Sequence, residues 1–385
     1  MLSSIATQAP ARAARIAVST LFFSAGFCFA SWASRIPDIQ QKLSLNEAGL
    51  GMVLLSLPVG LMVSLPVSGF VVARYGSRHT AIIAALLYAI LLPFLGIVVL
   101  VWQLVTVLFL FGFAGNLLNI SMNTQGVSVE ALYGRSIMAS FHGVWSVAGF
   151  SGAAVGAFML SLSVSPLLHF GIITILVCCF VIVVYKYLLT KDIHSDSKAP
   201  VFVKPDNALL KLGLIAFCCM VCEGTMFDWS GIYFAKEVQV PKSLTTLGYV
   251  AFMTTMAGGR FAGDRMSVKI GRKNMIRVSG LLIAGGLVLA VVLPYTIPAT
   301  IGFLITGMGV SSVVPLLYSA AGRSGKVAPG VALAAVSTIG YLGFLFGPPV
   351  IGLIAEAFGL RWSFALIAFL GLGVTLLAGF SRIED

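Results

Sequence analysis

Twelve apolar segments, each 19 to 28 residues long, make up most of the chain. About 20 apolar residues let an α-helix cross the hydrocarbon core of a bilayer, where a helix satisfies its own backbone hydrogen bonds. The sequence therefore predicts an all-α membrane protein with twelve transmembrane helices. The predicted spans are residues 14–34, 47–73, 80–100, 104–130, 136–163, 167–188, 209–235, 244–266, 275–293, 298–320, 329–353 and 361–381.

Charged residues make up only 10% of the chain, whereas soluble proteins carry roughly 25%. All six cysteines lie in apolar segments, which argues against a disulfide framework or a zinc site. We also find no P-loop, no metal-spaced histidine cluster and no G-x-S-x-G motif. We therefore expect no cofactor, no bound metal and no enzymatic activity, and the missing P-loop argues against an ATP-driven pump.

A polar linker, residues 189–208, predicts two six-helix halves, residues 1–188 and 209–385. An internal repeat supports this division, because the segment 68–78 aligns with 263–273 at an offset of 195 residues. The same offset places Gly112 on Gly307 and Gly152 on Gly347. Two such repeats predict alternating access around a site at their interface.

The lysines and arginines predict the orientation. With the N-terminus in the cytoplasm, cytoplasmic segments carry 18 of the 24 and outer segments carry five, while Arg260 lies inside a span. We therefore expect a multi-pass protein with both termini in the cytoplasm. The net charge of +11 is then explained by the inner leaflet, and we expect no nucleic-acid partner.

One acidic residue lies near the middle of the seventh predicted span, in the stretch 212–233. A carboxylate near the bilayer centre costs several kcal/mol unless it is protonated, paired or facing water. Glu223 is therefore the main candidate for carrying protons, although a neutral side chain hydrogen-bonded to another helix fits as well. Asp228 follows; we expect it to share this role or to face a cationic group of a substrate.

The loop after the second span resembles a motif of the major facilitator superfamily. Gly69-x3-Ala73-Arg74-x-Gly76-x-Arg78 resembles the pattern G-x3-D-R-x-G-R-R, with Ala73 in place of the usual acidic residue. The resemblance implies a gating latch formed by Arg74 and Arg78. Glu130, with Arg135, is a candidate for the missing charge. Alternatively, all these charges are solvated and serve only to set the topology.

Several blocks resemble the YbjJ/MosC-type subfamily of major facilitators along the whole chain. The resemblance implies a twelve-helix secondary transporter, and the link of MosC-type members to rhizopine, an amino-cyclitol, suggests polyols or sugar-like solutes. The blocks are ASWASRIPDI (30–39), NTQGVSVE (123–130), FHGVWSVAGFSGAAVG (141–156), CEGTMFDW (222–229), GGRF (258–261) and GYLGFLFGPPVIGLIAEAFGLR (340–361).

Amide and aromatic side chains mark the candidate substrate site. Asn116, Asn119 and Asn123 share one face of the fourth span and must meet protein or water, so they either bind hydroxyl groups or join helices. The other candidates are aromatic or hydroxyl residues that suit sugar-like rings, with membrane-interface anchoring as the alternative for the tryptophans: Trp32, Trp145, Trp229, Ser337 and Tyr341.

Three further ionisable residues are candidates for proton transfer or gating. His142 lies in the fifth span and is either a proton relay or a neutral structural histidine. Arg260 and Asp264 stand at i and i+4 in the eighth span and can pair with each other or with the seventh span, so we expect a structural or gating role rather than substrate binding. Pro348-Pro349 should kink or end the eleventh helix.

These observations predict a secondary active transporter in a bacterial cytoplasmic membrane. We expect it to move a small polar solute, such as a sugar, polyol or amino-cyclitol, by alternating access and with proton coupling, and to act as a monomer in the lipid bilayer. Two alternatives are open at this point. One is a proton-driven exporter of drugs or metabolites, and the other is a membrane receptor or scaffold that transports nothing.

Overall fold

The computed structural model describes residues 10–133, 137–192, 206–322 and 329–381. Within these ranges the chain forms fourteen α-helices, two short 3₁₀ helices (Tyr185–Tyr187 and Lys242–Leu244) and no β-strand. The α-helices are α1 (Ala11–Ala33), α2 (Ile36–Lys42), α3 (Glu47–Leu54), α4 (Ser56–Tyr75), α5 (Ser77–Ile97), α6 (Val101–Tyr133), α7 (Met138–Ser161), α8 (Pro166–Val184), α9 (Asn207–Lys236), α10 (Leu247–Ile270), α11 (Arg272–Val292), α12 (Thr296–Gly322), α13 (Pro329–Phe358) and α14 (Leu360–Phe380).

Eleven helical segments of the described chain are long and apolar enough to cross a membrane. They correspond to every predicted span except the eighth, which forms α10. This helix has 24 residues, enough to span, but its sequence contains Arg260 and three further charged residues towards its C-terminal end. The all-α class predicted from the apolar segments is confirmed.

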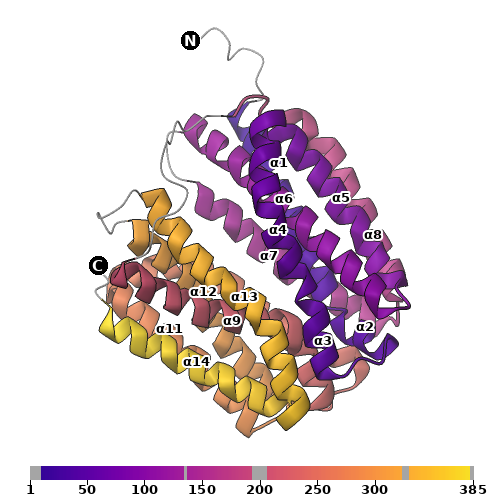
Figure 1. The fold of residues 1–385 in the computed structure, drawn as a ribbon, viewed down its shortest axis with the longest axis vertical. Helices are drawn as coiled ribbons and strands as arrows, with labels where there is room; N and C mark the ends of the chain where they lie inside the picture. The colour runs from indigo at the N-terminus through magenta and orange to yellow at the C-terminus, as the bar shows by residue number, and fades with distance from the viewer. Residues whose placement is uncertain (1–9, 134–136, 193–205, 323–328, 382–385) are drawn as a thin grey trace. The chain divides into compact units, whose positions relative to one another are not determined.

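The first compact unit comprises Met1–Leu43 and Ser56–Ser195. Within it, α1 packs against α7, α6, α8 and α5, while α4 packs along α6 and α5 lies against α6 and α8 (Figure 1). Helix α1 is therefore at the centre of the unit, and buried side chains occupy most of its length.

The second compact unit comprises Ser44–Leu55 and Asp196–Asp385. Helix α9 is its centre and packs against α13, α14, α12 and α10, while α11 lies between α12 and α14. Helix α3 also belongs to this unit and lies along α13. Neighbouring backbones come close there, because a Cβ added to Gly51 would lie 3.1 Å from the Cα of Gly352.

The second predicted span, 47–73, is interrupted at Leu55 and so forms two helices. Pro58 explains the position of the break, because it has no N–H to donate to the carbonyl of Leu54. By contrast, α13 continues through Pro348 and Pro349 to Phe358. Of the two expected outcomes, a kink or an end of the helix, the second is therefore wrong.

The structure supports the internal repeat at two pairs of positions. Gly76, between α4 and α5, has φ 80° and ψ 152°, and Gly271, between α10 and α11, has φ 79° and ψ 149°. This left-handed geometry favours glycine. A Cβ on Gly112 would overlap the carbonyl oxygen of Leu57, and one on Gly307 would overlap that of Phe252, again 195 residues later. The two units therefore share turn and helix-crossing geometry.

Candidate functional site

A buried ion pair lies inside the second unit. Glu223 is 7% exposed in the middle of α9, and its Oε1 lies 3.3 Å from a terminal guanidinium nitrogen of Arg260 on α10. The sequence suggested two partners for Arg260, Asp264 or a residue of the seventh span. In the structure Arg260 lies opposite Glu223 of the seventh span. The side chain of Asp264 lies outside the described residues. Pairing lowers the cost of keeping both charges in an apolar bundle.

Two tyrosines, from two more helices, lie near this pair. Tyr318 of α12 hydrogen-bonds with Ser337 of α13, and both Tyr318 and Tyr341 lie close enough to Glu223 to interact with its charge. Tyr341 also lies beside Phe344, with ring centroids 6.4 Å apart. Four helices, α9, α10, α12 and α13, therefore contribute a carboxylate, a guanidinium and two tyrosine hydroxyls, with the hydroxyl of Ser337 bonded to one of them. This combination can bind a hydroxyl-bearing solute and exchange a proton.

Asp228 forms a second, different environment further along α9. It is partly buried, and no lysine or arginine of the described residues lies within ion-pair distance of it. Tyr249 of α10 lies near enough to interact with its charge, and its buried hydroxyl has no hydrogen-bond partner among the described residues. The buried Trp229 likewise has an indole N–H without a described partner. Asp228 is thus a carboxylate without a described counter-charge.

The three asparagines of α6 do not act as one row. Asn116 is buried and donates to Ser64 Oγ on α4 at 2.7 Å, so it joins two helices. Asn123 donates to the side-chain oxygen of Asn119 at 2.9 Å and to its carbonyl oxygen at 2.7 Å. These last two amides are partly exposed, and they form the part of the row that can still meet a solute.

The aromatic candidates of the first unit differ in exposure. Trp32 is 1% exposed and lies in the core of the unit. Trp145 is partly buried and faces Phe29 at 6.4 Å between ring centroids. His142 is exposed, with its ring centroid 5.2 Å from that of Phe22.

The arginines of the loop motif contact aromatic rings. Arg74 lies 5.9 Å from the ring of Tyr75, and Arg78 lies 5.7 Å from the ring of Tyr185. Glu130 accepts hydrogen bonds from the backbone N–H groups of Ile137 and Met138, at 2.7 and 2.9 Å, and so caps the start of α7. Its proposed partner Arg135 lies outside the described residues.

Sequence reasoning missed an acid that binds at the loop motif. The carboxylate of Asp192 accepts hydrogen bonds from the backbone N–H and the hydroxyl of Ser77, the first residue of α5. Gln125 donates to Ser77 Oγ at 2.6 Å and exchanges two hydrogen bonds with the backbone of Leu189. An anion at a helix N-terminus is stabilised by the helix dipole. The only hint in the sequence was the position of Asp192, an acidic residue shortly after the sixth predicted span.

A second cluster lies near the start of α8, and sequence reasoning missed its histidine, His169. Arg35 is 1% exposed and donates to Asp38 at 2.8 Å, to the carbonyl of Val164 at 2.9 Å and to Nδ1 of His169 at 3.2 Å. His169 therefore accepts at Nδ1, which means that its proton is on Nε2. The guanidinium joins α1, α2 and α8 within the first unit.

The fold and this site define a class: a helical membrane transporter with polar groups held inside its bundles. The family model of the Major Facilitator Superfamily matches residues 17–328. A protein of Yersinia pestis described as an uncharacterised MFS-type transporter is 32% identical over 369 residues, which is 96% of each chain. The membrane protein MosC of Rhizobium meliloti is 32% identical over 368 residues, covering 94% of this chain and 89% of its own. The chain therefore belongs to the Major Facilitator Superfamily and is of the MosC-like type.

Solved structures show the same fold at low sequence identity. The nucleoside transporter NupG has a TM-score of 0.76 and 14% identity, covering 95% of this chain and 99% of its own. A bacterial homologue of the human lysosomal transporter Spinster has a TM-score of 0.77 and 13% identity, covering 96% and 97%. The major facilitator fold predicted from the loop motif is confirmed.

Proposed function

We propose that this transporter moves a small polar solute by alternating access and that Glu223 couples the movement to protons. The solute class is a sugar, polyol or amino-cyclitol. The buried Glu223–Arg260 pair carries the proposal, because the charge of a buried carboxylate strongly affects the cost of desolvation and the state of its partner. The tyrosine hydroxyls near the pair, together with Ser337 beside Tyr318, suit the hydroxyl groups of such a solute.

The coupling step follows from the charges. When Glu223 is ionised, Arg260 is held by it at 3.3 Å. A proton on Glu223 removes its negative charge and weakens the pair, so that the guanidinium can donate to an oxygen of the solute instead. Loss of the proton restores the pair and weakens solute binding. Proton and solute binding then favour each other, and thermodynamic linkage requires this effect to be mutual.

Asp228 is proposed to face a cationic group of the solute. Its support is the absence of a cation within ion-pair distance among the described residues, together with the nearby Tyr249. An ammonium group would supply the missing charge. This fits the amino-cyclitol branch of the proposed solute class and leaves Glu223 to the proton.

The test combines a ligand screen with a flux assay. Thermal-shift measurements with sugars, polyols, amino-cyclitols and lipophilic cations identify a binding solute. Proteoliposomes then report its accumulation under an imposed pH gradient. Glu223→Gln should abolish gradient-driven accumulation, whereas Glu237→Gln, at the C-terminal end of α9, should retain it. Lipophilic cations as the preferred class would support the exporter, and a folded protein that binds none of these compounds would support the receptor or scaffold.

A further inference from the structure

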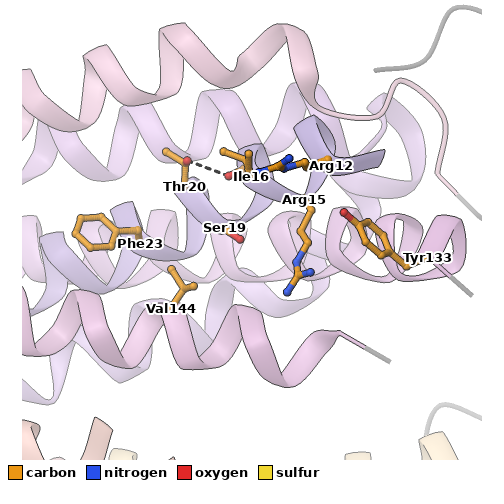
Figure 2. A pocket seen from close by; sticks show the side chains of 8 residues that line it. All are labelled: Arg12, Arg15, Ile16, Ser19, Thr20, Phe23, Tyr133 and Val144. Carbon is orange, nitrogen blue, oxygen red and sulfur yellow. Dashed lines mark hydrogen bonds between the residues drawn. The ribbon is translucent and has the colours of Figure 1, made fainter. Parts of the chain in front are cut away.

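A cavity of about 580 Å³ lies within the first unit, where α1 begins and α6 ends. Figure 2 shows Arg15 and Tyr133 near one another, with Arg12 and Ile16 nearby and Phe23 and Val144 further along the helices. The lining residues are Arg12, Arg15, Ile16, Ser19, Thr20, Phe23, Tyr133 and Val144. The cavity thus has a cationic end and an apolar end.

The cationic end has no acid among its described lining residues to balance it. None of the eight lining residues is acidic, and neither arginine forms an ion pair with a described residue. Arg15 is held in place by Ser140 Oγ at 3.3 Å and lies 5.5 Å from the ring centre of Tyr133. Its position is therefore fixed by neutral groups, and its charge remains available to an anion.

The start of α1 adds to the positive potential. Its first turn contains no acidic residue, and Pro10 at the N-cap provides no side-chain hydrogen bond. The N-terminus of a helix carries a partial positive charge, so arginines there are unfavourable unless an anion is close. Bidentate guanidinium groups are well suited to phosphate oxygens. Charge and geometry both favour a phosphate group at this end.

The apolar end distinguishes a lipid from a soluble anion. Ile16 is 56% exposed, and Phe23 and Val144 are partly exposed, all within predicted spans. An acyl chain would cover these side chains, whereas a free phosphate would leave them bare. The lysine and arginine distribution also predicts that this end faces the cytoplasmic leaflet, where anionic lipids attract basic groups.

We infer that this cavity binds an anionic phospholipid, with its phosphate group at Arg12 and Arg15 and an acyl chain along Ile16, Phe23 and Val144. The site is separate from Glu223 and does not depend on which solute is transported. Bound lipid would neutralise the start of α1 and hold α1 against α7. Together, the two arginines should raise the affinity of the site for an anionic headgroup about 30-fold.

Native mass spectrometry of the purified protein tests this inference. The probes are phosphatidylglycerol, phosphatidylethanolamine and glycerol 1-phosphate. Wild type should retain one phosphatidylglycerol in preference to phosphatidylethanolamine, and Arg12→Gln/Arg15→Gln should weaken that binding about 30-fold. The matched control, Lys269→Gln/Lys273→Gln, removes two cations from the second unit and should bind like wild type.

A second variant tests the acyl-chain part of the site. Val144→Phe keeps both arginines but fills the apolar end of the cavity, so it should also weaken phosphatidylglycerol binding. Its unfolding temperature should equal that of wild type. Unchanged binding in the double arginine variant would overturn the inference. An equal loss of phosphatidylglycerol binding in the lysine control would also overturn it, because the effect would then be one of general surface charge. If glycerol 1-phosphate competed fully with phosphatidylglycerol, the cavity would instead be a site for soluble anions.

Discussion

Glu223 on α9 and Arg260 on α10 are each other's counter-charge inside the second unit, with 3.3 Å between carboxylate oxygen and guanidinium nitrogen. Breaking a buried pair by removing one partner leaves an uncompensated charge and costs about 3–5 kcal/mol. Arg260→Gln and Glu223→Gln should therefore each lower the unfolding temperature in detergent. The double variant should lose less than the sum of the two, and strictly additive losses would contradict the pairing.

Asp228 should respond in the opposite way to loss of charge. Because no described cation balances it, Asp228→Asn removes a desolvation cost and should leave the unfolding temperature unchanged or raise it. The same variant should bind amine-bearing solutes at least 10-fold more weakly than wild type does, as measured by titration calorimetry. Its affinity for the corresponding hydroxyl-bearing solutes should change little. A large destabilisation would indicate a structural partner for this carboxylate.

The cap on α5 should matter for stability but not for solute binding. Asp192 accepts from both the backbone N–H and the hydroxyl of Ser77, so Asp192→Asn should cost about 1–2 kcal/mol. Lys191→Gln, one residue earlier, is the control and should be neutral. Thermal unfolding separates the two, and equal behaviour of both variants would contradict the role given to Asp192.

The equivalent glycines of the two units should be equally intolerant of a side chain. Gly112→Ala and Gly307→Ala place a methyl group against the carbonyls of Leu57 and Phe252, and overpacking of this kind typically costs about 1–3 kcal/mol. The control is Gly69→Ala, where an added Cβ meets nothing within 4 Å. If the alanine variants at the crossings unfold like the control, the crossings are not as tight as described.

The all-α transmembrane architecture could be predicted from the sequence alone. Bilayer thickness sets the length of each apolar segment, and the internal repeat sets the spacing between equivalent segments. Side-chain partners were harder to predict, because they depend on which helix faces reach each other. Asn116 illustrates this: its helix face was evident, but its bond to Ser64 on α4 was not. Asp192 and His169 were missed for the same reason, since each binds a residue more than 100 positions away.

Gradient-driven accumulation in proteoliposomes tests the central claim most directly. Vesicles containing wild type or Glu237→Gln should concentrate the identified solute when a pH gradient is imposed. Vesicles containing Glu223→Gln should only equilibrate it, while still exchanging labelled for unlabelled solute across the membrane. Accumulation by Glu223→Gln at the wild-type level would contradict the assignment of proton coupling to this carboxylate.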